Sequence, residues 1–170
     1  MNTVLVQEAH RFNRLLAVIR PSLINIEKAT RGEVVMSTEL ERVANSLIIN
    51  KVPDLWMSKS YPNRKNLFNY FNDLLKRLQM LEDWYQNGIP ACFWFPGFYF
   101  VQSFVTAVRQ NYARRNKFAI DEVMLSEIVL TMEIPTEPPT EGGAYVHGVY
   151  IEGKFSALRG EEKVRRGQDR

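Results

Sequence analysis

Cysteine and histidine are scarce in this 170-residue protein, which has one cysteine and two histidines. The single cysteine, Cys92, excludes an internal disulfide and fits a reducing compartment. Together with His10 and His147 it makes no recognisable set of metal ligands, so no metal site is predicted. Cys92 also lies in the apolar run Cys92–Phe95, without a nearby cation to lower its pKa, which disfavours a nucleophile pair with His147.

Patterns that bind phosphate or perform acid–base catalysis are absent as well. The sequence has no G-x-x-x-x-G-K-[ST] pattern, and so nothing that would cradle nucleotide phosphates. Glu82 and Asp83 are adjacent on a predicted helix and point in different directions, so they do not form a dyad. Glu39 and Glu41 lie at the start of another predicted helix, where negative charge complements the helix dipole. We therefore predict no catalytic residue, no cofactor and no enzyme activity for this chain.

Long hydrophobic runs and a localised excess of charge are also missing. No apolar run reaches about 18 residues without a charge, and the N-terminal residues do not form a secretory signal. The formal net charge is +3, but residues 154–170 hold six basic and three acidic side chains, which leaves 16 of each in residues 1–153. Because the surplus is confined to the tail, neither a nucleic acid nor a membrane is expected as a partner.

What the sequence does contain is helical periodicity, first in residues 4 to about 30. Pro21 interrupts this segment, and a kink or a restart is expected near Arg20 because proline removes a backbone hydrogen bond. Gly32 can end it. A second helix starts at Thr38, which forms a predicted capping box with Glu41.

A third helix is predicted over residues 64–86, with the cleanest amphipathic pattern in the sequence. Its apolar stripe includes Leu75 and Trp84. Between the second and third helices, residues 53–66 form a polar connector that carries Trp56 and Tyr61. These two side chains are expected to pack on the neighbouring helices rather than to contact a partner.

The most apolar and aromatic window is Ile89 to Arg115. Pro96 suits the first turn of a helix, since its missing N–H would have no partner there. From Phe98, apolar residues recur at helical spacing, and we interpret the window as a buried core helix. Its basic end, Arg114 and Arg115, complements the helix dipole first and offers a contact patch second.

After the helices, residues 126–134 and 144–152 alternate in the manner of β-strands, separated by a loop rich in proline and glycine. The two strands are predicted to pair antiparallel. The fold class is therefore α+β, predominantly α-helical with a short antiparallel β region near the C-terminus. The predicted division is a helical part over 1–125, a hairpin-like part over 126–153 and a charged, disordered tail over 154–170.

The central window also resembles a known family, the C-terminal region of dynein heavy chains of the axonemal type. The resemblance is carried by a dense run of residues in the window, which are Phe93, Trp94, Gly97, Phe98, Phe100, Gln102, Phe104, Thr106, Gln110, Asn111 and Tyr112. It extends over residues 3–153 and includes Trp56 and Tyr61 in the connector. The family continues into further strands that close a small barrel, whereas this sequence continues into its charged tail, so an incomplete barrel is expected.

The resemblance implies a fragment of a minus-end-directed microtubule motor of cilia and flagella, in which Met1 is not a natural start. The implied role is structural and regulatory, without ATP hydrolysis by this region. The implied partners are the ATPase ring of the same heavy chain and the dynein complex, with microtubules contacted only indirectly. Arg109, Arg114 and Arg115 are the candidate contact residues for the ring.

Two other hypotheses stay open from the sequence. One is a stand-alone helical protein-interaction module derived from the dynein C-terminal region. The other is a nucleic-acid-binding module, which the balanced charge of residues 1–153 opposes.

Overall fold

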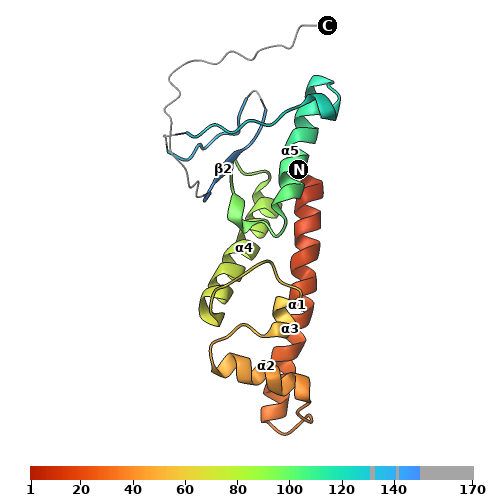
Figure 1. Cartoon of the computed structure of the whole chain (residues 1–170), viewed down its shortest axis with the longest axis vertical. Helices are drawn as coiled ribbons and strands as arrows, with labels where there is room; N and C mark the ends of the chain where they lie inside the picture. The colour runs from red at the N-terminus through yellow and green to blue at the C-terminus, as the bar shows by residue number, and fades with distance from the viewer. Residues whose placement is uncertain (131–132, 141, 150–170) are drawn as a thin grey trace.

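The computed structural model describes residues 1–130, 133–140 and 142–149. Figure 1 shows an elongated arrangement in which α1 and α5 lie end to end along one side, with α2 and α3 beside the far end of α1 and β2 beside α5. The elements in sequence order are α1 (Asn2–Thr30), α2 (Thr38–Ile48), α3 (Asp54–Met57), α4 (Leu67–Asn87), β1 (Cys92–Trp94), the 3₁₀ turn η1 (Phe95–Gly97), α5 (Val101–Asn116), the 3₁₀ turn η2 (Ile120–Glu122) and β2 (Tyr145–His147).

The sequence predicts a kink or a restart near Arg20, but α1 is one helix through Pro21, so the restart is wrong. Ile19 and Ser22, on either side of the proline, are both buried, and the packing of this stretch holds the backbone in helical geometry although one hydrogen bond is missing. The expected end at Gly32 is confirmed. Gly32 has φ +77°, a conformation that favours glycine, and its N–H donates to the Ala29 carbonyl at 3.1 Å.

Helix α2 is capped one residue earlier than the sequence pattern predicted. Ser37 is the N-cap, and its side-chain oxygen accepts the backbone N–H of Leu40 at 3.2 Å. The predicted capping box of Thr38 and Glu41 is therefore wrong, because Thr38 is already the first helical residue. Serine and threonine are both good caps, and the sequence Ser37–Thr38 does not show which of them is used.

The connector packs inward, as predicted. Trp56 is fully buried, and its indole N–H donates to the Ser22 hydroxyl of α1 at 2.9 Å. Tyr61 is buried too, and its ring stacks on that of Tyr70 with centroids 5.7 Å apart. These two aromatic side chains join the short α3 and its loop to α1 and α4.

Helix α4 buries a narrower stripe than its apolar residues suggest. The buried positions are Tyr70, Asp73, Leu74, Arg77, Leu81 and Trp84. Leu75 was assigned to the core by periodicity, but its side chain is 60% exposed, so that assignment is wrong. Leu74 takes the inward position, and successive side chains on a helix are about 100° apart, which turns Leu75 toward the surface.

The β region differs most from the prediction. β1 and β2 pair in parallel, with Cys92 opposite Tyr145 and Trp94 opposite His147. The predicted antiparallel pairing of 126–134 with 144–152 is wrong, and the described residues form no barrel. In the described part of 126–134 there is no strand, and Ile128 and Val129 are exposed there. An alternating pattern does not fix a strand unless a partner pairs with it and covers its apolar face.

Parallel strands need a long connection, and α5 with the loop that follows it supplies one between β1 and β2. The aromatic run of the central window thus pairs with a segment about fifty residues further on. The division proposed at residue 125 stays a prediction. The charged tail, 154–170, lies outside the described residues.

Candidate interaction surface

The central window forms an aromatic cluster where α4, β1 and α5 meet. The Phe104 ring lies 4.7 Å from both the Phe93 and the Phe98 ring centroids, and Trp84 lies 5.2 Å from Phe93 in an edge-to-face arrangement. All four side chains are buried. This cluster fixes the first turns of α5 against α4 and sets the direction in which the rest of α5 extends.

Gly97 is required by close packing at the edge of this cluster. A Cβ atom at this position would lie 2.7 Å from the Met80 sulfur and 2.7 Å from the Trp94 ring. Gly97 is one of the residues that carry the family resemblance. The close packing gives a local physical reason for glycine here, since a larger side chain would collide with its neighbours.

The other side of α5 is polar and open. Gln102, Thr106, Gln110 and Asn111 are exposed, and so is Phe100 at the N-cap. Tyr112 is half-buried, with its ring packed closely against Gly142. The structure thus divides the predicted set of window residues between the aromatic core and the surface.

Positive charge gathers toward the end of α5. Residues 84–120 contain no aspartate or glutamate but include Arg109, Arg114, Arg115 and Lys117. Arg114, Arg115 and Lys117 are exposed. Lys117 adopts a left-handed conformation (φ 57°) that ends the helix. Arg109 is half-buried instead, and within the described residues its Nε atom is buried without a hydrogen-bond partner.

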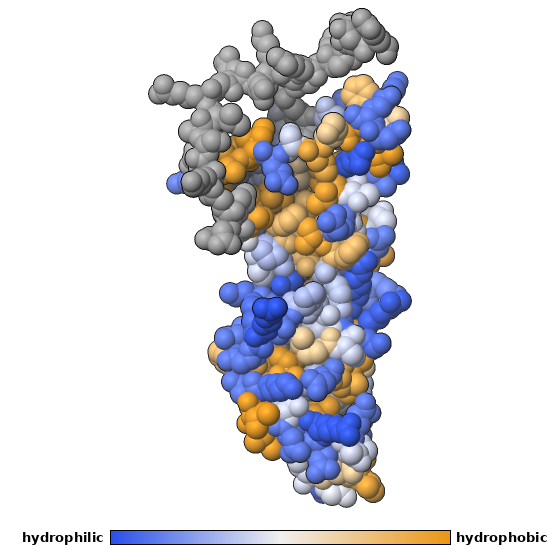
Figure 2. Space-filling model, in the orientation of Figure 1, coloured by the Kyte–Doolittle hydropathy of each residue, from blue (hydrophilic) through white to orange (hydrophobic). Residues whose placement is uncertain are grey.

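These cations have no carboxylate partner within the described part of the protein, where none of the ion pairs involves them. The next acidic residues, Asp121 and Glu122, lie in η2. Phe118 and Ile120 are exposed beside the cations. We define the α5 contact surface as Arg114, Arg115, Lys117, Phe118 and Ile120. On the side of the molecule seen in Figure 2, hydrophobic residues gather near the end where α5 and β2 lie.

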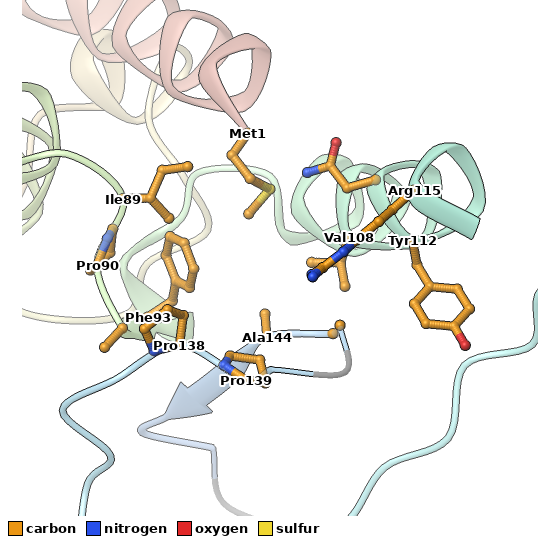
Figure 3. A pocket seen from close by; sticks show the side chains of 14 residues that line it. Met1, Ile89, Pro90, Phe93, Val108, Tyr112, Arg115, Pro138, Pro139 and Ala144 are labelled. Atoms are coloured by element: carbon orange, nitrogen blue, oxygen red, sulfur yellow. The ribbon is translucent and has the colours of Figure 1, made fainter. Parts of the chain in front are cut away.

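A cavity of about 160 Å³ adjoins this surface. Figure 3 shows Met1, Phe93 and Val108 around it, with the Arg115 side chain extending from α5 toward its middle. Pro138, Pro139 and Ala144 line the opposite side. The lining is mostly apolar with a single cation, which suits packing by an apolar side chain better than a bound metabolite.

A second, open groove of about 450 Å³ lies between α4 and β1 and is lined in part by Cys92 and His147. The structure thus brings the only cysteine and one histidine to the same groove. Burial raises the pKa of the Cys92 thiol, however, which opposes formation of the reactive thiolate. The arrangement therefore gives no support to a nucleophile pair.

Sequence reasoning missed two groups of buried charge, which are Glu8 on α1 and the pair of Asp73 and Arg77 on α4. Glu8 and Arg77 bind the backbone of residues 98–100 in the window. Asp73 of α4 binds Lys65 at 2.6 Å and Arg77 at 2.7 Å. Burial raises the pKa of Asp73, but the hydrogen bonds from Lys65 and Arg77 outweigh this effect and lower it below the usual range. Glu8 of α1 is fully buried and accepts backbone N–H groups from Tyr99 and Phe100.

Both groups had a signal in the sequence. Glu8 lies four residues from Val4 and from Phe12, and Asp73 and Arg77 lie on the stripe between Tyr70 and Leu81. A charged residue at a buried helical position needs a partner, because burying an unpaired charge is costly.

Other kinds of site find no support in the described residues. Nowhere in 1–130, 133–140 or 142–149 do three or more His, Cys, Asp or Glu side chains come together as candidate metal ligands. In the same ranges, no helix has the combined length and hydrophobicity that crossing a lipid bilayer requires.

The described residues define a helical scaffold with a minimal parallel sheet, an aromatic core and a basic surface at one end. The family model for the C-terminal domain of the dynein heavy chain matches residues 1–156. The protein belongs to this family, and the resemblance found in the sequence is confirmed.

The similar curated proteins include several axonemal dynein heavy chains. The sequence is 50% identical over 153 residues to dynein axonemal heavy chain 3 of Homo sapiens, covering 90% of this chain and 4% of that protein. It is 45% identical over 166 residues to dynein axonemal heavy chain 12 of Mus musculus, covering 95% of this chain and 5% of that protein. It is 48% identical over 155 residues to dynein axonemal heavy chain 1 of Homo sapiens, covering 90% of this chain and 4% of that protein. The chain thus spans about a twentieth of each relative.

Proposed function

We propose that this chain is a non-catalytic structural and regulatory part of an axonemal dynein heavy chain, a subunit of a minus-end-directed microtubule motor. The observation that carries the proposal is the 50% identity to an axonemal heavy chain across 90% of this chain. The whole subunit would hydrolyse ATP in its ring of ATPase modules. This region would work by packing and contact, in the axoneme of a cilium or flagellum.

The partner we propose is the ATPase ring of the same heavy chain, contacted through the α5 contact surface. Arg114, Arg115 and Lys117 project positive charge, and Phe118 and Ile120 add apolar area beside it. A cationic rim around apolar side chains suits a partner surface that carries carboxylates around an apolar patch. Other subunits of the dynein complex would be contacted through the ring, and microtubules only indirectly.

The test is binding of the purified chain to a recombinant ATPase ring of a related heavy chain that lacks its own C-terminal domain. The double variant Arg114→Glu/Arg115→Glu should weaken binding by about tenfold or more, because it turns attraction into repulsion. The effect should shrink at high salt.

The matched control is Arg14→Glu/Arg42→Glu, which makes the same change of charge at exposed positions on α1 and α2. It should leave binding unchanged. Equal weakening by both double variants would point to net charge alone and would remove the α5 contact surface from the proposal. In a separate assay, ATP turnover by the purified chain above the buffer background would contradict a non-catalytic role.

A further inference from the structure

The tripeptide Phe98–Phe100 joins η1 to α5, and side chains from α1 and α4 hold its backbone. Arg77 of α4 donates to the Phe98 carbonyl at 3.2 Å. Glu8 of α1 accepts the backbone N–H groups of Tyr99 and Phe100, the latter at 3.1 Å. We call this tripeptide with Glu8 and Arg77 the α5 junction.

Glu8 uses both carboxylate oxygens at the junction. Oε2 accepts from the Tyr99 N–H, and Oε1 accepts from Phe100 and from the Arg11 guanidinium at 3.2 Å. The same guanidinium lies 4.7 Å from the Phe100 ring centroid. A fully buried carboxylate is thus satisfied by one cation of its own helix and two amides that lie more than ninety residues away. Charge-assisted bonds of this kind are stronger than bonds between neutral groups.

The side chain of Tyr99 extends the junction to the connector. Its hydroxyl donates to the Lys59 carbonyl, and its ring lies edge-on to Phe12 of α1 at 5.6 Å and to Tyr61 at 6.0 Å. Helix α5 itself begins without a side-chain cap, since its N-cap Phe100 has no polar side chain. The order at the start of α5 therefore comes from other elements, and Glu8 of α1 makes the hydrogen bonds to its backbone.

We propose that Glu8 is a positioning residue that makes α1 and α5 move as one rigid column, and that loss of its contact at the junction uncouples α5 from α1. The aromatic cluster with α4 would persist, so uncoupling would change the direction of α5 without unfolding the helical core. This device is a property of the fold and does not depend on the identity of the partner.

The test is hydrogen exchange of the whole protein with Glu8→Gln. The amide side chain has one acceptor oxygen and one donor group, so either Tyr99 or Phe100 loses its acceptor. Exchange of peptides covering residues 98–106 should accelerate by about tenfold or more, while peptides of α2 keep their protection. The matched control, Glu27→Gln, removes an exposed ion pair with Arg31 in the same helix and should change nothing at 98–106.

Two results would overturn the proposal. One is unchanged exchange at residues 98–106, and the other is a uniform increase in every helix, which would indicate a general loss of stability. If Glu8→Gln fails to fold, Arg11→Gln decides. Arg11 is partly exposed, and its replacement weakens the junction while Glu8 keeps the two backbone N–H groups that it accepts. Faster hydrogen exchange confined to residues 98–106 in Arg11→Gln supports the proposal, and unchanged exchange there refutes it.

A second readout measures the coupling directly. Spin labels at the exposed positions Asn13 on α1 and Gln110 on α5, in a Cys92→Ser background, report the distance between the two helices. The distance distribution should be narrow with Glu8 and should broaden with Glu8→Gln. A narrow distance distribution both with Glu8 and with Glu8→Gln would contradict the proposal that Glu8 couples the two helices.

Discussion

Trp56 donates its indole N–H to the hydroxyl of Ser22 at 2.9 Å, and Ser22 donates in turn to the Ile19 carbonyl at 2.7 Å. These linked hydrogen bonds tie the connector to α1 one residue after its proline. Ser22→Ala leaves the buried indole N–H without its acceptor and should lower the free energy of unfolding by about 1–3 kcal/mol, measured by urea denaturation. Ser46→Ala, at a half-buried helical serine that bonds only its own helix, is the control and should change stability little. Equal losses of stability in the two variants would mean that the hydrogen bond from Trp56 adds nothing to the effect of losing a helical serine.

Substitutions of Phe104 and Leu75 test which side chains belong to the hydrophobic core. Phe104 is 2% exposed and packs against three other rings, so Phe104→Ala should cost about 3–5 kcal/mol of stability. Leu75→Ala should cost no more than about 0.5 kcal/mol in the same urea denaturation assay, because more than half of that residue's surface is already exposed to water. A large loss from Leu75→Ala would mean that α4 buries a different face in solution.

A side chain at position 97 is expected to destabilise the fold. Gly97→Ala places a methyl group against the Met80 sulfur and the Trp94 ring, and the strain should cost about 1–3 kcal/mol in thermal or urea unfolding. Combining it with Met80→Ala should recover part of that loss, because one of the two obstructing groups is then gone. An unchanged free energy of unfolding in Gly97→Ala would show that this packing is looser than described.

Asp73 makes stability depend on pH. Its pKa in the folded protein lies below the ordinary value of 3.8 because Lys65 and Arg77 bind the carboxylate. The unfolded protein therefore takes up this proton first as the pH falls. The stabilisation is present above the unfolded pKa and is lost as the pH drops through the folded pKa.

The measurement is the difference in free energy of unfolding between wild type and Asp73→Asn. It should stay constant from neutral pH to about pH 5 and shrink below about pH 4. Asp83→Asn is the control, because within the described residues this exposed carboxylate binds Gln79 and no cation, and its replacement should lower stability less at neutral pH. A difference that persists unchanged into strong acid would contradict the role given to Lys65 and Arg77.

The helices could be predicted from the sequence because apolar spacing, glycine and aromatic anchors all act locally. Gly32 ends α1, and Trp56 and Tyr61 pack inward, as their patterns indicated. The pairing of β1 with β2 could not be predicted, since parallel pairing is decided by partners far apart in sequence. The described residues of 126–134 show that an alternating pattern is not enough by itself.

The candidate site was predictable in part. The basic residues Arg114 and Arg115 are exposed at the end of a helix, as the sequence suggested, whereas Arg109 is half-buried. Glu8 and Arg77 were missed because their importance depends on backbone groups of residues 98–100, and which side chain reaches which backbone atom is a property of the tertiary structure. Their positions on buried stripes were the available hint.

The most direct test of the account is a full-length transcript read across the codon for Met1 and past that for Arg170. If the protein is part of an axonemal dynein heavy chain, the open reading frame continues upstream of Met1 into sequence that encodes ATPase modules with phosphate-binding loops. A transcript that begins its reading frame at Met1 and stops after Arg170 would contradict the account and would favour a stand-alone interaction module with a dynein-like fold.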